Sequence, residues 1–291
     1  MAGVYFHLWL AVEAWGRGLS RLPRACQSGL LPCFLAGAIA PDLGFFPGGP
    51  VDFSTWVHEE PTGDLVRALA AEARSPAERA LATGWGLHVV TDQIVHGWVD
   101  DQVDRLFAGP QAPPDGDRDL WHMRLEWGID CQLLARPESR PLWWPRLAFP
   151  ARPDGDLMLA AAGSRYSGGE LTAATMDSAG RTAQRWLRWL PWLLYHCGKV
   201  RPVGWRRPCP WAASLDRLTE VHLGDRWAGR PGRRTAAAVA RPWAPAPLTQ
   251  ALIAVHAERC LDAFGAHASH GFSAYSGAAG GEAGPVAATA P

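Results

Sequence analysis

Apolar and polar residues recur at helical spacing along most of the chain, and no segment shows the alternation from which a β-sheet is built. The clearest helix starts at 75–78, Ser-Pro-Ala-Glu, which combines an N-cap serine, a proline at the first helical position and an early carboxylate. This helix is predicted to continue to about Leu106. Its middle, 85–98, is mostly apolar, so we expect the helix to be buried on most sides.

The same reasoning predicts further helices on both sides of this central one. The predicted helices are Val4–Arg17, Leu30–Ile39, Gly63–Arg74 after an N-cap at Thr62, Arg118–Leu134, Leu171–His196 with a kink at Pro191, Trp211–Trp227 and Leu248–Phe264. Segments rich in proline, glycine or arginine, such as 45–57, 109–117, 136–154 and 230–247, are predicted to be loops or linkers. The fold class is therefore all-α, a multi-helix bundle around a buried central helix.

Tryptophan is abundant, with 16 residues among 291. A stripe of aromatic residues at helical spacing, Trp186, Trp189, Trp192 and Tyr195, is predicted to pack in the core. Trp143 and Trp144 are candidates for the rim of a groove. Residues 1–264 are predicted to form one helical domain, with 1–135 supplying its functional site, and the Ala/Gly-rich segment 265–291 a disordered tail.

Charge and cysteine usage exclude several classes of protein. The chain has 28 basic and 28 acidic residues, so no overall field attracts nucleic acid or an anionic surface. The six cysteines form no Cys-x-x-Cys pair and suggest no disulfide framework, which predicts reduced thiols and a cytoplasmic protein. We find no signal-peptide pattern, and the longest apolar run near the start, 29–40, is too short to span a bilayer.

Candidate metal ligands lie in the central helix. His88, Asp92 and His96 are spaced at i, i+4 and i+8, which puts them on one helix face. Burying an aspartate between two histidines without a partner would cost several kcal/mol. A divalent cation removes that cost because imidazole and carboxylate are zinc ligands; a polar core satisfied by neighbouring side chains is the alternative. His122 and Glu126 form a second i, i+4 pair, for which a surface pair is the alternative.

Three more residues of ligand type precede the central helix: His7 in the first helix, Asp42 in a Pro-Asp turn, and His58 in a loop. In this order, the eight residues resemble the zinc-dependent phospholipase C family, whose relatives include the single-strand-specific fungal zinc nucleases. Those proteins are all-helical and hold a trinuclear zinc cluster in one cleft. The resemblance covers about residues 1–135 and implies a phospholipase C or zinc nuclease-like bundle.

The resemblance also implies a distribution of ligands. One zinc would be held by His58, His88 and Asp92 with Asp42 nearby, a second by His96, His122 and Glu126, and a third by His7 with Asp92 as a bridge. Asp42 would act as general base, or as a ligand that orients the attacking water. The family completes its third site with an N-terminal tryptophan, whereas this chain begins Met1-Ala2-Gly3, and its Asp92–His96 gap is shorter than in the family. Two or three zinc ions are therefore expected.

The expected activity is hydrolysis of a phosphodiester by zinc-bound hydroxide, because zinc lowers the pKa of bound water to about 7. Arg124 is a candidate clamp for the substrate phosphate, and Asp119 and Asp130 are candidates for orienting the ligands. A phospholipid suits the neutral overall charge better than nucleic acid does, since only a loose arginine cluster at 201–207 is present. A single-strand nuclease and a non-enzymatic helical scaffold with a structural or incomplete metal cluster are the alternatives. The sequence does not indicate an oligomeric state.

Overall fold

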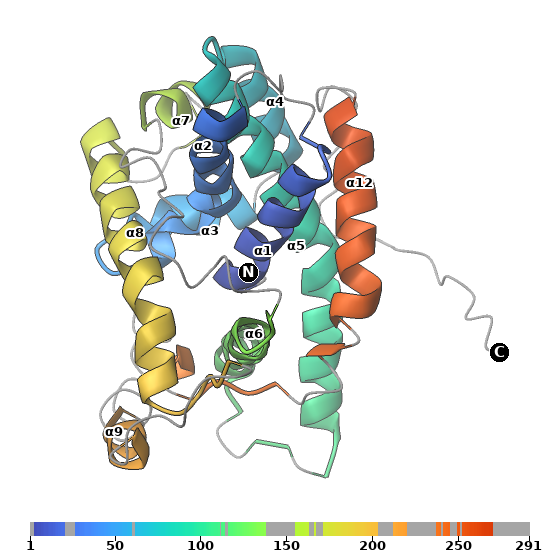
Figure 1. The fold of residues 1–291 in the computed structure, drawn as a ribbon, viewed down its shortest axis with the longest axis vertical. Helices are drawn as coiled ribbons and strands as arrows, with labels where there is room; N and C mark the ends of the chain where they lie inside the picture. The colour runs from blue at the N-terminus through green and yellow to red at the C-terminus, as the bar shows by residue number, and fades with distance from the viewer. Residues whose placement is uncertain are drawn as a thin grey trace, which may run out of the picture.

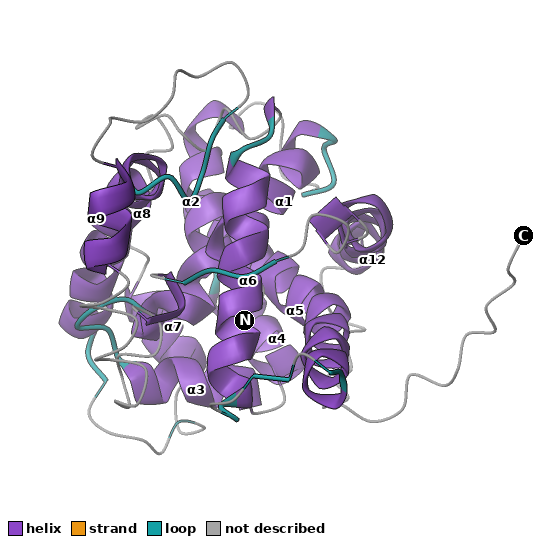
Figure 2. Cartoon of the chain, turned by 90° about the horizontal axis from the view of Figure 1, so that it is seen from below, coloured by secondary structure: helices purple, strands orange, loops and turns teal. Residues whose placement is uncertain are grey.

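In the computed structural model, the residues described are 3–20, 27–59, 62–110, 112–113, 116–137, 155–162, 166, 171–202, 212–219, 237–239, 241–244, 249–250 and 252–269. Every regular element in these ranges is helical, which confirms the predicted all-α class (Figures 1 and 2). The predictions for Trp143 and Trp144 lie outside the described residues. The division into a domain at 1–264 and a disordered tail stays a prediction.

The central helix is α5 (Pro76–Ala108), which runs along much of the molecule in Figure 1. It begins at the predicted N-terminal signal. The hydroxyl of Ser75 accepts a hydrogen bond from the N–H of Glu78 at 3.1 Å, and the Glu78 carboxylate accepts one from the N–H of Ser75 at 2.8 Å. Together these two bonds satisfy donors that the first turn would otherwise leave unpaired. Helix α12 (Ala257–Ser269) lies along α5, and α2 (Gln27–Ile39) also packs against it.

Two glycines allow the backbones of α2 and α5 to touch. A Cβ atom built on Gly84 of α5 would lie 2.0 Å from the carbonyl oxygen of Phe34, and one on Gly37 of α2 would lie 2.0 Å from the carbonyl oxygen of Leu81. No side chain fits in either gap, so this helix pair depends on the absence of a side chain at both positions. The contact brings the backbone of Ala38 beside His88.

The remaining described elements surround this pair. They are α1 (Val4–Gly16), the 3-10 helix η2 (Ala40–Phe45), α3 (Val51–Glu59), α4 (Thr62–Glu72), α6 (Arg118–Leu134), α7 (Gly155–Ala162), α8 (Ala173–His196), α9 (Ala212–Thr219) and the π-helical turn η6 (Leu252–His256). The bounds of α6 agree with the prediction. The predicted loop 45–57 is wrong from Val51 on, and His58 does not lie in a loop either, because both belong to α3. The apolar residues Phe53 and Val57 of this helix are buried one turn apart. Helix α7 was not predicted, and α12 continues past Phe264 to Ser269.

The N-terminus of α1 is held by a side chain of α6. The buried carboxylate of Asp130 accepts hydrogen bonds from the N–H groups of Tyr5 at 3.0 Å and Phe6 at 2.9 Å. Burial raises the pKa of Asp130 well above its usual value, although these two bonds favour the carboxylate. Asp130 was predicted to orient the metal ligands. Its hydrogen bonds instead go to the backbone of α1. It positions α1, and with it His7.

The aromatic stripe of α8 is not in the core. Leu187, Leu190 and Leu194 form the buried face of this helix, whereas the tryptophans are exposed: Trp186 by 41%, Trp189 by 66% and Trp192 by 38%. The core prediction is therefore wrong for these three tryptophans, because a helical period identifies a common face without saying what covers it. Among the described helices, none combines the length and the apolar character that crossing a bilayer requires.

Candidate metal centre

All eight predicted ligands meet in one place, although they come from five different elements. His7 lies on α1, Asp42 on η2, His58 on α3, the series His88, Asp92 and His96 on α5, and His122 and Glu126 on α6. Their ligand atoms form three groups in which the atoms all lie within 4.8 Å of one another: His7, Asp42 and His88; His58, His88 and Asp92; and His96, His122 and Glu126. Donor groups of this type at these separations could each hold a metal ion.

Asp92 is at the centre of the cluster. Its Oδ1 atom lies 3.1 Å from Nε2 of His7 and 3.7 Å from Nε2 of His96. Its Oδ2 atom lies 3.3 Å from Nε2 of His58 and 3.2 Å from Nε2 of His88. One carboxylate therefore has histidines from three helices around it, with its two oxygens facing different partners.

Backbone carbonyls orient two of the histidines. Nδ1 of His58 lies 2.6 Å from the carbonyl oxygen of Ser54, and Nδ1 of His88 lies 2.9 Å from that of Ala38. A carbonyl oxygen only accepts, so Nδ1 carries the proton in each ring. In the neutral ring, Nε2 then keeps its lone pair, and both Nε2 atoms point into the cluster, 3.3 Å apart.

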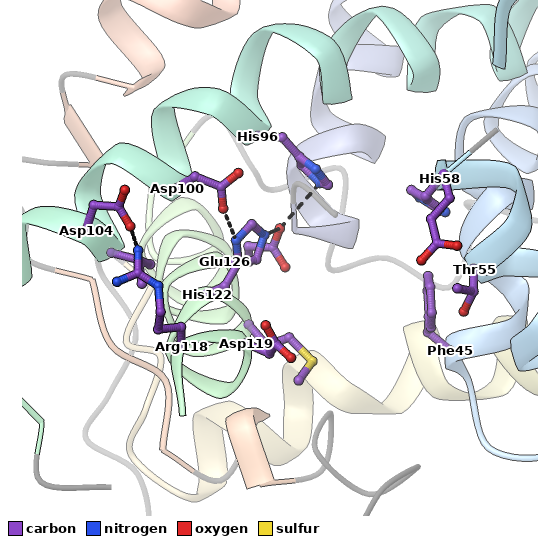
Figure 3. Close-up of a pocket in the computed structure, with 13 residues that line it drawn as sticks. Phe45, Thr55, His58, His96, Asp100, Asp104, Arg118, Asp119, His122 and Glu126 are labelled. Atoms are coloured by element: carbon purple, nitrogen blue, oxygen red, sulfur yellow. Dashed lines mark hydrogen bonds and ion pairs between the residues drawn. The ribbon is translucent and has the colours of Figure 1, made fainter. Parts of the chain in front are cut away.

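His122 is oriented by a carboxylate that sequence reasoning did not select. Asp100 of α5 accepts a hydrogen bond from Nδ1 of His122 at 2.8 Å, while Nε2 of His122 lies 2.9 Å from Oε1 of Glu126 (Figure 3). The signal was present, because Asp100 continues the four-residue series of His88, Asp92 and His96 along the same helix face. A carboxylate behind a histidine fixes the ring and increases its basicity towards a metal.

A cavity of about 470 Å³ opens beside this cluster. Figure 3 shows Phe45, Thr55 and His58 on one wall and the residues of α5 and α6 on the other. The side chain of His96 is 32% exposed, whereas those of His7 and Asp42 are 0% exposed. The cluster is thus sealed at its inner end and open at the end that meets the cavity.

The sequence model of a known family, described as zinc dependent phospholipase C, matches residues 7–165. The chain belongs to the zinc-dependent phospholipase C family. No curated protein and no solved structure matches it. The matched segment includes all eight residues of the centre and extends beyond the N-terminal 135 residues on which the resemblance was based.

The electrostatics of this phospholipase C-family centre favour positive charge. Burial lowers the pKa of His58, but hydrogen bonds to Asp42 and Asp92 and their negative charges outweigh it and raise the pKa to about 10. Burial likewise opposes a protonated His122, yet the charge of Glu126 and the bond to Asp100 raise its pKa to about 9. The carboxylates therefore stabilise positively charged groups inside the buried cluster.

The carboxylates respond in the opposite direction. Burial raises the pKa of Asp92, but the positive charge of His88 and hydrogen bonds from His58 and His7 bring it well below its usual value. The pKa of Asp42 is also lowered, by His88 and His58, against the effect of burial. Burial and the charge of His88 lower the pKa of His7 and so favour its neutral, ligating form.

The innermost donors fit a zinc-dependent member of the family. Among the described residues, both ring nitrogens of His7 and both carboxylate oxygens of Asp42 are buried without a hydrogen bond of good geometry. Their polar neighbours are other members of the cluster, with Nε2 of His58 3.2 Å from Oδ1 of Asp42. An unsatisfied buried polar group costs about 1–3 kcal/mol. A bound cation would satisfy these nitrogens and oxygens together, so the residues present suit zinc.

Arg124, the candidate clamp for the substrate phosphate, does not lie at the cavity of this phospholipase C-family chain. Arg124 is buried, with its guanidinium carbon 4.8 Å from the centroid of the Trp121 ring, and it does not line the cavity. Arg118 lines the cavity instead and pairs with Asp104 (Figure 3). Asp119 also lines it. The position of an arginine along α6 does not by itself show whether its side chain faces the protein interior or the cavity.

Proposed function

We propose that this chain hydrolyses a phosphodiester bond of a phospholipid, using zinc ions held by the eight residues of the centre. The observation that carries the proposal is a buried histidine–carboxylate cluster, open at one end to a cavity of about 470 Å³. Structural zinc sites are closed, whereas catalytic ones keep a position for water or substrate. An open cluster therefore supports catalysis over the alternative of a scaffold.

We assign the ligands by their grouping. His58, His88 and Asp92 would hold one ion, and His96, His122 and Glu126 another. His7 and Asp42 would hold a third together with the shared residues His88 and Asp92. When bound, zinc supplies Lewis-acid stabilisation of the negative charge that develops on a phosphoryl oxygen, and it makes water a better nucleophile at neutral pH.

The role of Asp42 stays a prediction with two forms, general base or ligand that orients water. Its carboxylate is wholly buried behind His58 and does not line the cavity. A general base must come within hydrogen-bond reach of the proton that it removes. Burial therefore supports the ligand role. Glu126, unlike Asp42, does line the cavity, and its Oε1 atom lies 2.9 Å from Nε2 of His122.

The lining of the cavity supports a lipid headgroup that carries a positive charge. The carboxylates of Glu59 and Asp119 line it together with the ring of Phe45, whose centroid lies 5.5 Å from that of His58. Carboxylates and an aromatic face attract a quaternary ammonium group such as choline. The same carboxylates would repel the successive phosphates of a nucleic acid, which makes single-strand nuclease activity the weaker candidate.

Hydrolysis of dihexanoyl phosphatidylcholine is the test. The purified protein is expected to release phosphocholine, to lose this activity after dialysis against a zinc chelator, and to regain it when zinc is added back. Single-stranded DNA serves as the competing substrate. Zinc-loaded protein that cleaves the DNA but not the lipid would replace the proposal with the nuclease. A folded chain that takes up no zinc would replace it with the scaffold.

Asp100→Asn tests the orientation of His122. The neutral amide of asparagine is a weaker hydrogen-bond acceptor than the carboxylate that accepts from Nδ1 of His122 at 2.8 Å. The affinity of the group His96, His122 and Glu126 for zinc is therefore expected to fall about 10- to 100-fold. Competition with a chromogenic chelator measures this directly, without reference to turnover. Asp101→Asn makes the same chemical change at the next residue of α5, which does not line the cavity, and should leave the affinity unchanged. Equal affinities for the two variants would contradict the role of Asp100.

A further inference from the structure

The outer face of α8 carries large apolar side chains that the fold does not cover. Trp189 is 66% exposed, Trp186 41% and Leu193 38%. Spaced at i, i+3 and i+7, these three residues lie on one side of the helix, whereas Leu187 and Leu190 are buried. We name these three residues the α8 face. Exposing two tryptophans and a leucine together is unusual for a face that only meets water.

Arginines border the α8 face. Arg181, Arg185 and Arg188 are exposed, and α8 contains no acidic residue from 181 to its end at His196. Arginine keeps its guanidinium at a polar boundary while its apolar stem lies along neighbouring side chains. This combination of tryptophan, leucine and arginine on one helix is typical of helices that lie at the surface of a lipid bilayer.

We propose that the α8 face binds a phospholipid bilayer, with Trp186, Trp189 and Leu193 entering the headgroup region and the bordering arginines contacting lipid phosphates. The inference rests on the proposed function, since a bilayer is where such a substrate is found. Charge decides between a bilayer and a protein as the occupant. Lipid phosphates complement the exposed guanidiniums of Arg181, Arg185 and Arg188, and this part of α8 has no acidic residue that would repel them.

The helix that carries this face is attached to the metal centre. Its inner side packs against η2, which contributes Asp42 to the centre and Phe45 to the cavity. The hydroxyl of Tyr5, on the helix that carries His7, donates a hydrogen bond at 3.0 Å to the carbonyl oxygen of Leu187. Figure 1 shows α8 along one edge of the molecule. A bilayer bound to the α8 face would therefore contact a helix that packs against the wall of the cavity.

The experiment measures binding of the full chain to vesicles of phosphatidylcholine and phosphatidylglycerol by sedimentation, with a zinc chelator present so that no hydrolysis occurs. The wild-type chain is expected to sediment with the vesicles. The double variant Trp186→Ser, Trp189→Ser should have an affinity for the vesicles that is lower by about tenfold or more. Val255→Ser, which removes a 53% exposed apolar side chain from η6, is the matched control and should bind like the wild type.

A second variant keeps the test independent of the tryptophans. Arg185→Glu with Arg188→Glu should weaken binding to the anionic vesicles and reduce its dependence on salt. Because binding is measured without zinc, a failure of catalysis leaves it unaffected. Conversely, the tryptophan variant should hydrolyse monomeric dihexanoyl phosphatidylcholine normally and lose turnover only on vesicles. Equal vesicle binding by the wild type and both variants would overturn the proposal, as would a dimer that the tryptophan variant converts to monomer.

Discussion

Asp92→Asn is expected to lower the turnover of dihexanoyl phosphatidylcholine by about a thousandfold, and to reduce the zinc retained by the chain. The Asp92 carboxylate lies within 3.3 Å of the Nε2 atoms of His7, His58 and His88, so it contacts three of the proposed ligands at once. An amide has neither the second anionic oxygen nor the charge that favours cations there. Metal-ion stabilisation is worth several kcal/mol, and each 1.36 kcal/mol is tenfold in rate.

The measurement combines zinc content by mass spectrometry with initial rates on the soluble lipid. Asp101→Asn, an identical change at an exposed position of the same helix, should match the wild type in both. Circular dichroism checks that α5 still forms in each variant. An Asp92→Asn chain that keeps its full zinc and its activity would show that the cluster is not the catalytic centre.

Gly84→Ala is expected to lower the thermal midpoint by about 2–12 °C. Helix propensity alone favours alanine over glycine by about 1 kcal/mol, so the expected sign is opposite to the local preference. The new Cβ would lie 2.0 Å from the carbonyl oxygen of Phe34 and 3.0 Å from the backbone nitrogen of Ala38, and backbone cannot move aside as a side chain does. Overpacking of this kind costs about 1–3 kcal/mol, and each kcal/mol shifts the midpoint by about 2–4 °C in a chain near this size.

The same substitution should also weaken zinc binding. Gly84 is one turn before His88, whose Nδ1 atom donates to the carbonyl oxygen of Ala38 at 2.9 Å. Pushing α2 away from α5 would remove the acceptor that orients this ring. Gly97→Ala is the control, since a Cβ there meets nothing within 4 Å, and it should leave the midpoint unchanged or raise it slightly. A midpoint for Gly84→Ala at or above that of Gly97→Ala would contradict the close approach of the two helices.

Much of the fold could be predicted from local signals. The start of α5 at Ser75 and the bounds of α6 depend on capping residues and periodicity within a few positions of the chain. The common face of His88, Asp92 and His96 follows from helix geometry alone. Such signals need no knowledge of other elements. They were enough to identify the all-α class. The zinc-dependent phospholipase C family was suggested by a resemblance in the order of eight residues of ligand type, which the family match confirms.

Contacts between distant elements were not predictable in this way. Asp130 was considered as a partner for the ligands, but it binds the N-terminus of α1, 125 positions away from Tyr5. Asp100 has the same spacing as the proposed ligands, yet the structure pairs it with His122. Arg124 and Arg118 share one helix, and only the packing of α6 decides which of them meets the cavity.

The sequence alone therefore determined most of the helices, though not α3 and α7, and the identity of eight residues of ligand type, because helix formation and helix faces depend on short-range geometry. The tertiary structure decided which of these residues meet, that the cluster opens on a cavity, and that Trp186 and Trp189 remain outside the core. A periodic pattern defines a face, but what covers that face depends on the free energy of packing against segments far away in the chain. The pairs Gly37 and Gly84, and Asp100 and His122, acquire their roles only from that packing.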